Sequence, residues 1–135
     1  MATDLNGDGF PDLAVTASTD RLVVRIINKG TPAVAGPTFN QPSTAYATGV
    51  EPIALASADI NRDGFQDLVV VNKVNETVTV YLGYGDGTAV ASETYPVGNA
   101  PQSVAVGDFN GDGWPDLAVA NSGDDTVTIL RNRGS

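Results

Sequence analysis

Residues 108–117 read DFNGDGWPDL and place four oxygen-bearing side chains close together in the chain. If Asp108 is counted as position 1, carboxylate or amide oxygens stand at positions 1, 3, 5 and 9, and glycine stands at position 6. A hard cation such as calcium takes about six to eight oxygen ligands, and short Asp and Asn side chains reach a common point only from a tightly curled loop. The glycine permits the sharp turn, because it enters positive φ at little cost. The spacing therefore predicts a calcium-binding loop.

Two further stretches, which begin at Asp4 and Asp59, repeat this loop position for position. Each copy keeps an aromatic residue at position 7 and a leucine after the last aspartate. We expect the side chains at positions 1, 3, 5 and 9 and the carbonyl at position 7 to coordinate the ion, with water completing the shell. The candidate ligands are Asp4, Asn6, Asp8, Phe10 and Asp12 in the first loop, Asp59, Asn61, Asp63, Phe65 and Asp67 in the second, and Asp108, Asn110, Asp112, Trp114 and Asp116 in the third. The chain is therefore expected to bind three calcium ions.

The loop resembles the start of an EF-hand but differs from one at its end. An EF-hand closes with a bidentate glutamate at its twelfth position, where this chain has Val119. The residues after Asp116 read LAVA, which is typical of a buried strand and not of an exiting helix. We therefore expect the ion to lie in a turn between two strands. An Asp- and Gly-rich hairpin without a metal is the alternative, and the three copies of the pattern weigh against it.

The composition fits one acidic domain, and more than half of its acidic residues lie in the three loops. The chain has 135 residues, no cysteine and a formal charge of −9, and nine of its sixteen acidic residues are loop aspartates. Since each calcium ion carries two positive charges, three ions would change the net charge from −9 to about −3. The seven Lys and Arg residues form no basic cluster, so we expect no nucleic-acid partner. No apolar run is long enough to span a membrane.

The residue types argue against catalysis. The chain has no His and no Cys, which excludes a His-activated nucleophile and a His-based metal hydrolase site. Carboxylates alone can cleave glycosides, but the clustered ones are assigned to calcium. The remaining acids include Asp20, Glu51, Glu76, Asp86 and Glu93, which show no paired pattern. We expect the protein not to be an enzyme.

The loops mark a repeat that extends over the whole chain. Their first aspartates lie at 4, 59 and 108, which gives periods of 55 and 49 residues. No helical periodicity is visible, and short β-branched runs alternate with Gly and Pro turns. Ten strands are expected, at about 13–15, 22–27, 44–48, 53–58, 68–71, 77–82, 92–97, 103–107, 117–119 and 126–130. About four short strands per repeat predict an all-β fold of β-propeller blades, each a four-stranded antiparallel sheet.

We treat residues 1–135 as one propeller segment with repeat units of approximately 1–49, 50–98 and 99–135. The strands are almost continuously apolar, which is expected where neighbouring blades bury both faces of a sheet. The first unit lacks the first strand of its blade, and the third lacks the last strand. About three blades per chain cannot close a ring.

The pattern D-x-N-x-D-G-x-x-D-L, followed by a strand, T-V-x-V and a Gly-rich turn, resembles the FG-GAP/VCBS repeat. This resemblance covers nearly all of the chain and implies a propeller like that of integrin α-subunits, with calcium in the loop between the first two strands of each blade. It also implies a secreted or cell-surface protein. Two departures concern Arg62, which replaces a loop glycine and is expected to face solvent, and Arg25, which stands where other copies have Val80 and Ile129.

These expectations imply a homo-oligomer and leave a carbohydrate or protein ligand as a further partner. Uncapped terminal blades would expose apolar faces, so either the chain is part of a longer propeller or several chains complete the ring. A dimer with six blades is favoured, and a dimer in which twenty strands form five full blades is the alternative.

The favoured function is a structural, self-assembling scaffold. The alternative is recognition of a carbohydrate or protein ligand. Aromatic residues that could stack on sugars are Tyr81, Tyr84, Tyr95 and Trp114.

Overall fold

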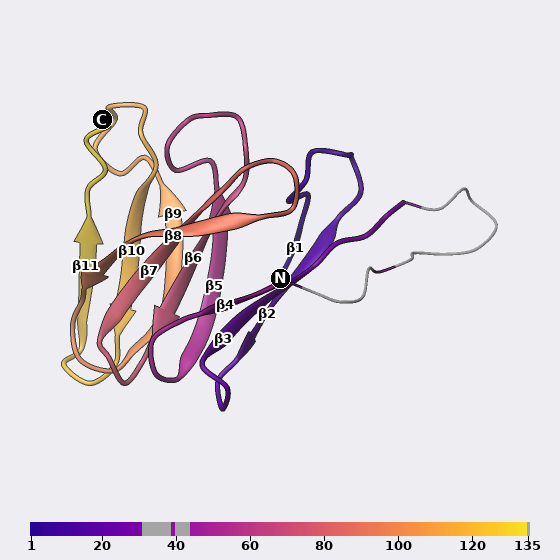
Figure 1. Ribbon diagram of the computed structural model, residues 1–135. Helices are drawn as coiled ribbons and strands as arrows, with labels where there is room; N and C mark the ends of the chain where they lie inside the picture. Colours follow the sequence, from indigo (N-terminus) through magenta and orange to yellow (C-terminus); the bar gives the residue numbers. More distant parts are fainter. Residues whose placement is uncertain (31–38, 40–43, 135) are drawn as a thin grey trace.

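The computed structural model describes residues 1–30, 39 and 44–134, and every regular element within them is a β-strand. The all-β prediction is therefore confirmed for the described chain. Three antiparallel sheets stand side by side in chain order, from the indigo first sheet to the yellow third sheet, and do not close into a ring (Figure 1). None of the described residues forms a helix long and apolar enough to cross a membrane. Residues 31–38 and 40–43 of the first predicted repeat unit lie outside the described chain.

Each sheet is a meander in which every strand pairs with its neighbours in sequence. The first sheet has the order β1 (Ala2–Thr3), β2 (Asp12–Ala17), β3 (Leu22–Ile26) and β4 (Thr44–Ala47). The middle sheet has the order β5 (Pro52–Ala58), β6 (Asp67–Asn72), β7 (Thr77–Gly83) and β8 (Ala89–Pro96). The third sheet has the order β9 (Pro101–Gly107), β10 (Asp116–Asn121) and β11 (Thr126–Leu130).

The prediction that the first sheet lacks its first strand is wrong. The two-residue strand β1 pairs with Asp12 and Leu13 of β2. Two backbone hydrogen bonds of 2.9 Å between Met1 and Ala14, one in each direction, continue this pairing to the end of the chain. Residues before the first loop are thus extended, because their backbone groups find partners on β2. The described residues form eleven strands, one more than expected.

The hairpin after each loop keeps the same register in the three sheets. Its closing pairs are Ala17 with Leu22, Asn72 with Thr77, and Asn121 with Thr126. The residue before the second strand of each hairpin has positive φ: 56° at Arg21, 55° at Glu76 and 53° at Asp125. A repeated turn conformation and repeated β-branched runs therefore produce the repeated sheet.

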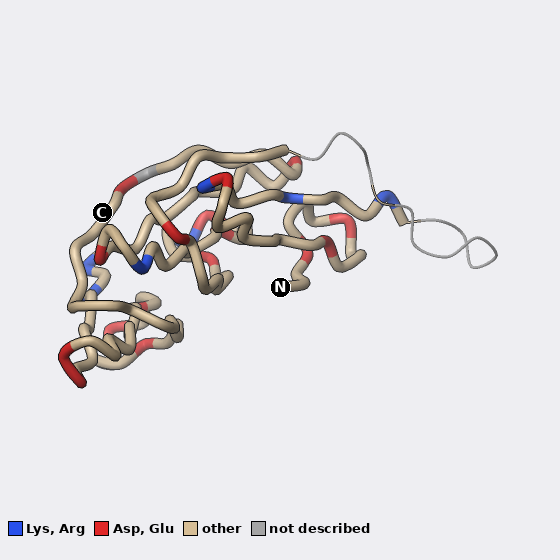
Figure 2. The backbone as a smooth tube through the Cα atoms, turned by 90° about the horizontal axis from the view of Figure 1, so that it is seen from below, with Lys and Arg blue, Asp and Glu red and all other residues tan. Residues whose placement is uncertain are grey.

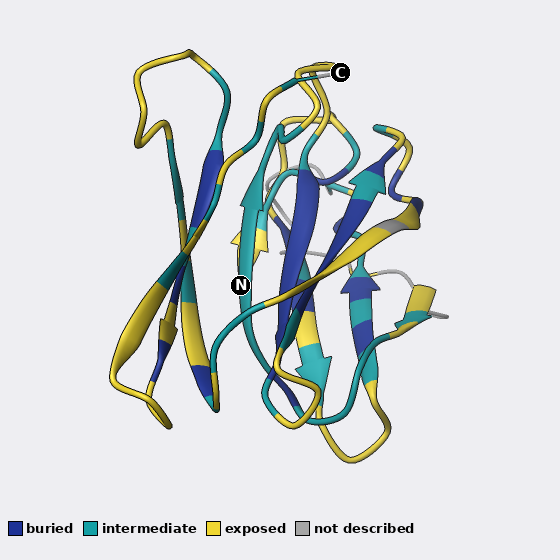
Figure 3. Ribbon diagram, turned by 90° about the vertical axis from the view of Figure 1, so that its left-hand side faces the viewer, coloured by how far each residue is buried: buried dark blue, intermediate teal, exposed yellow. Residues whose placement is uncertain are grey.

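The central strands of the middle sheet, β6 and β7, are buried on both faces. One apolar cluster joins Leu68, Val70 and Tyr81 to Ala14 and Val23 of the first sheet. The other joins the opposite face of the middle sheet to the third sheet, through Val69, Val71, Val78, Val80, Leu117 and Val119. All six residues of β6 are buried, whereas β11 alternates between exposed and half-buried residues (Figure 3). This confirms the predicted cause of the near-continuous apolar run in β6.

The outer faces of the first and third sheets are exposed. Val15 on β2 is 46% exposed, and Val127 and Ile129 on β11 are 63% and 46% exposed. Their equivalents in the middle sheet, which are Val70, Val78 and Val80, are at most 5% exposed. The outer sheets therefore carry the apolar residues of a sheet-to-sheet interface on a face that no described residue covers.

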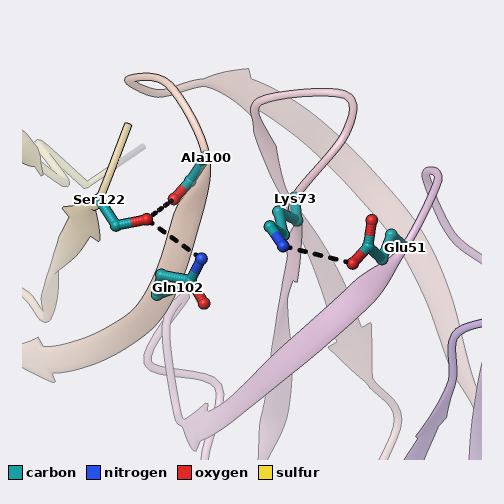
Figure 4. Close-up of polar contacts among 5 residues, drawn as sticks. All are labelled: Glu51, Lys73, Ala100, Gln102 and Ser122. Carbon is teal, nitrogen blue, oxygen red and sulfur yellow. Dashed lines mark hydrogen bonds and ion pairs between the residues drawn. The ribbon is translucent and has the colours of Figure 1, made fainter. Parts of the chain in front are cut away.

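At the end of the sheets opposite the loops, the middle and third sheets use different contacts at equivalent places (Figure 4). Lys73 Nζ lies 3.5 Å from Glu51 Oε1 in the middle sheet. In the third sheet Ser122 Oγ donates a 3.0 Å hydrogen bond to the Ala100 carbonyl and accepts one of 3.1 Å from Gln102 Nε2. The exposed ion pair contributes little, because solvent screens it. Both sheets share a backbone hydrogen bond at this place. The amides of Lys73 and Ser122 donate to the carbonyls of Glu51 and Ala100 at 3.0 and 3.1 Å.

Arg25 is a buried charged residue between the first and middle sheets, where the other two sheets have an apolar residue. Its side chain is 1% exposed on β3, at the place of Val80 and Ile129 in the other sheets. Nη2 donates a 3.4 Å hydrogen bond to the Leu5 carbonyl, while Nε and Nη1 have no hydrogen-bond partner among the described residues. Burial lowers the pKa of Arg25, although Tyr46 opposes the shift. The guanidinium is therefore desolvated without full compensation.

We expect Arg25→Leu to stabilise the protein by about 1 to 3 kcal/mol, because replacing a poorly paired buried charge by a hydrophobic residue removes its desolvation cost. Urea unfolding followed by circular dichroism measures the change. Lys29→Leu, which removes one positive charge at an exposed residue, serves as the control and should change stability by less than about 0.5 kcal/mol. A loss of stability in Arg25→Leu would show that the guanidinium is a favourable part of the core.

Candidate metal centres

The three predicted loops lie at the same place in the three sheets, between the first and second strands. The carboxylate at position 1 accepts hydrogen bonds from backbone amides of its own loop. Asp4 accepts from Gly7 and Gly9 at 2.7 and 2.9 Å. Asp108 accepts from Gly111 and Gly113 at 2.7 and 2.8 Å. Asp59 accepts from the amides of residues 63 and 64, both at 2.9 Å. The loop is thus curled around its first aspartate.

Positions 3 and 5 are joined to each other in every loop. The asparagine amide donates to the aspartate carboxylate two residues later, at 2.9 Å in the first loop and 2.8 Å in the other two. The same asparagine accepts the amide of that aspartate through Oδ1, at 3.0 to 3.2 Å. The aspartate in turn accepts the amide of the aromatic residue at position 7, at 2.9 Å in all three loops. The structure therefore brings the side chains of positions 1, 3 and 5 together in one small loop.

Position 9 lies in a different environment, at the base of the loop. Asp12, Asp67 and Asp116 are fully buried. In each, Oδ2 accepts the backbone amide at position 2 of the loop, at 2.8, 2.7 and 3.1 Å. In each, Oδ1 accepts an amide sixteen residues further along the chain, that of Asn28, Gly83 or Asn132, at 2.7, 2.9 and 2.8 Å. This carboxylate fastens the loop to the end of the third strand of its sheet.

The aromatic side chain at position 7 covers a glycine near the same strand end. A Cβ atom built on Gly30 or Gly85 would lie 2.2 Å from the ring of Phe10 or Phe65, and one on Gly134 would lie 2.6 Å from that of Trp114. All three glycines have positive φ, between 56° and 72°. Sequence reasoning missed this contact and the amides that bind position 9. The sequence signal for both was present, because these glycines and amide-bearing residues lie at the same number of residues from the loop in every repeat. The metal-binding role of the position-7 carbonyls remains a prediction.

Neighbouring loops also contact each other. Arg62 is exposed, as predicted, and its backbone has φ of 60° where the equivalent Gly7 and Gly111 have 74° and 77°. Its guanidinium carbon lies 5.2 Å from the centroid of the Trp114 ring, which is a cation–π contact between the second and third loops. Asn132 Nδ2 donates a 2.8 Å hydrogen bond to the Ile60 carbonyl at the same junction. The second and third loops are thus in direct contact with each other.

The pKa values of Asp4 and Asp108 at position 1 shift in the opposite direction from that of Asp67 at position 9. Burial raises the pKa of Asp4, but the amides of Gly9 and Gly7 outweigh it and the pKa lies below its ordinary value. In the third loop the Gly113 amide is the main cause of the lowered pKa of Asp108. Burial raises the pKa of Asp67 despite its hydrogen bonds to Gly83 and Ile60. Acidic residues recur along the loops, while basic residues are few (Figure 2).

The donor set suits a hard cation, although the carboxylates are not gathered around one point. Within the described residues, no three acidic side chains form a metal-binding group. The position-5 carboxylate is turned toward the asparagine at position 3, and the position-9 carboxylate is directed into the sheet. A carboxylate oxygen that accepts one amide retains a second lone pair. Oxygen ligands of this kind are those that calcium prefers, so the residues fit the ion in chemical type.

Comparison with known proteins identifies the repeat. The sequence model of one family, described as FG-GAP-like repeat, matches residues 4–70 and 59–119. The two matches begin on Asp4 and Asp59, which are the first aspartates of two loops. Together they extend over more than four fifths of the chain. No curated protein matches the chain.

The burial of position 9 generates a test that needs no metal. In EDTA, Asp67→Ala should lower the free energy of unfolding by about 2 to 4 kcal/mol, because the amides of Ile60 and Gly83 lose their acceptor. Asp63→Ala, in the same loop at position 5, should cost less than about 1 kcal/mol, because its partners are exposed to water. Urea unfolding of both variants measures the difference. Equal losses would contradict a structural role special to position 9.

Proposed function

The chain belongs to the FG-GAP-like repeat family, and we propose that it is a non-catalytic, calcium-binding segment of a β-propeller that serves as a self-assembling structural scaffold. The observation that carries this proposal is the closely similar hydrogen-bonded geometry of three Asp- and Asn-rich loops on three adjacent sheets. Repeats of this family are typical of extracellular or surface proteins. We accordingly propose a secreted or cell-surface location, where calcium is abundant.

In each loop, the side chains at positions 1, 3 and 5 would hold the ion, together with the carbonyl at position 7 and water. Asp4, Asn6 and Asp8 supply these oxygens in the first loop, and the equivalent residues supply them in the other two. The carboxylate at position 9 already bonds two amides, and it would contribute its remaining lone pairs. When bound, calcium supplies a cross-link that offsets the repulsion between the carboxylates. The loop residues position the oxygens, and position 9 holds the loop on the sheet.

The placement of the aromatic residues favours the scaffold over carbohydrate recognition. Tyr81 is buried in the core, and its hydroxyl donates a 2.5 Å hydrogen bond to the Ala47 carbonyl. Trp114 is engaged by Arg62. Tyr84 is exposed on the turn between β7 and β8. Sugar-binding sites that rely on stacking need a ring that is open to solvent. Tyr95 and Trp114 line one pocket, but Arg62 already contacts the Trp114 ring, so this pair offers one unengaged ring for stacking on a sugar.

Assembly is proposed from the two open faces. Val127 and Ile129 on the outer face of the third sheet repeat Val78 and Val80, which pack against the next sheet in the chain. Val15 on the outer face of the first sheet repeats Val70, which packs against the preceding sheet. The third sheet of one copy therefore has the residues to pack on the first sheet of a second copy. Two copies related in this head-to-tail manner would place six sheets in a ring.

Calcium should stabilise the folded chain. Sites of extracellular modules bind at roughly 10⁻⁴ to 10⁻³ M, so millimolar calcium should add about 1 kcal/mol per site through preferential binding to the folded state. Thermal unfolding in calcium should occur several degrees above that in EDTA, and calorimetry should count three ions. Asp112→Ala should reduce the count to two. Magnesium at the same concentration controls for ionic strength and should have a smaller effect. Identical unfolding curves in calcium and EDTA would contradict the proposal of metal sites.

Assembly predicts a mass about twice the 13.9 kDa of one chain in sedimentation equilibrium at micromolar concentration. Val127→Asp should give a folded monomer, because a charge on the outer face of the third sheet cannot be buried against a second copy. Val74→Asp is the matched control, since Val74 is exposed in a turn and lies on neither outer face. A calcium-loaded wild-type monomer would exclude the dimer.

A further inference from the structure

The junction between the second and third loops is occupied by an arginine of this chain. Arg62, at position 4 of the second loop, places its guanidinium carbon 5.2 Å from the centroid of the Trp114 ring. The same guanidinium lies beside Gly113, because a Cβ atom built on that glycine would be 3.5 Å from Nη1 of Arg62. Trp114 is half-buried under this contact. Position 4 of one loop thus covers positions 6 and 7 of the next.

The junction between the first and second loops lacks this arginine. Position 4 of the first loop is Gly7, and the aromatic residue of the second loop is Phe65. A Cβ atom built on Gly7 would have no heavy atom within 4 Å, so the space beyond it is open. The Phe65 side chain is 43% exposed. Among the described residues, the only cation–π contact is the one at the other junction.

A pocket of about 330 Å³ occupies the first junction. One side is lined by Thr3, Asp4, Leu5 and Gly7, and the other by Gly64, Phe65, Gln66 and Gly85. Gly64 and Phe65 stand at positions 6 and 7 of their loop, as do the two residues that Arg62 contacts in the third loop. The pocket therefore lies where an arginine side chain lies at the next junction.

The charges around the pocket favour a cation. The first and second loops carry three aspartates each, and Asp4 lines the pocket. The only basic residue within the two loops is Arg62, whose guanidinium lies against the third loop. Arg25 is buried behind the pocket wall, where its Nη2 donates to the Leu5 carbonyl, and it offsets one of these negative charges. The loops around the pocket thus keep an excess of negative charge.

A guanidinium suits both sides of the pocket. Its flat face can lie on an aromatic ring, which attracts a cation, and its N–H groups can donate to a carboxylate. Asp4 accepts the amides of Gly7 and Gly9, one on each oxygen, and each oxygen retains a second lone pair. An ammonium group is a compact point charge without a flat face, so it fits the ring less well.

We propose that the pocket between the first two loops binds the guanidinium of an arginine side chain that a protein partner presents. The guanidinium lies on the Phe65 ring and donates to Asp4, in the place that Arg62 takes at the next junction. The proposal requires neither calcium nor a closed ring. Calcium would offset two of the three aspartate charges in each loop, so we expect weaker binding in calcium than in EDTA.

The test follows amide NMR signals of the isotope-labelled full chain during titration with N-acetyl-arginine amide, in EDTA and in calcium. We expect saturable shifts of the Gly7, Gly64 and Phe65 amides. Blocked citrulline, which has nearly the same shape without the charge, should bind about tenfold more weakly. Phe65→Leu should weaken binding of the blocked arginine about two- to fivefold, because the cation–π contact is lost.

Two arginine variants make a matched pair. Gly7→Arg supplies the arginine from within the chain and should abolish binding, and Arg62 shows with its φ of 60° that the loop admits this residue at position 4. Gly111→Arg places the same residue at position 4 of the third loop, outside the pocket, and should leave binding unchanged. Conversely, Arg62→Gly should open a second site, with saturable shifts of the Gly113 and Trp114 amides.

Shifts that do not saturate, or equal binding of blocked arginine and blocked citrulline, would overturn the proposal. Unchanged binding in a folded Gly7→Arg variant would also overturn it. If that variant does not fold, full-strength binding in Phe65→Leu together with the lack of a second site in Arg62→Gly would do so. Tighter binding of free arginine than of the blocked form would overturn the assignment to a protein side chain. A failure of calcium binding or of dimer formation would leave the expectations in EDTA unchanged.

Discussion

The structure depends on a buried carboxylate that joins two parts of each repeat. The last loop aspartate binds one amide at the start of its loop and another at the end of the third strand. An aspartate is suited to this task because its two oxygens accept in different directions. A buried ionised group is costly without hydrogen bonds. A change that removes one of these amides therefore destabilises the attachment of the loop to the sheet.

Around this connection, the three sheets pack face to face through two apolar clusters. The middle sheet has neighbours on both sides and buries β6 completely. The outer sheets carry the same residue types with one neighbour each, so residues such as Val127 remain in water. The exposure of these residues therefore reflects their position in the array and not a different sequence pattern.

The sequence alone predicted the all-β class, the three loops and nearly every strand, because spacing, turn residues and β-branched runs are local signals. It did not predict β1, since Ala2 and Thr3 carry no pattern and pair only because β2 offers partners. It assigned Asp12, Asp67 and Asp116 to a metal, whereas their burial and their amide partners sixteen residues away appear only in three dimensions. The clustering of acids was visible in the sequence, but the direction of each side chain was not.

The meander within each sheet has a kinetic consequence. Every strand pair joins neighbours in sequence, and all connections except that between β3 and β4 are short. Closing short loops costs little conformational entropy, and proteins rich in such contacts fold faster than β-proteins with distant pairings. Contacts between sheets then resemble those of a linear array, in which stability passes from one unit to the next. The middle unit, which gains from both neighbours, is the one from which ordering can spread in either direction.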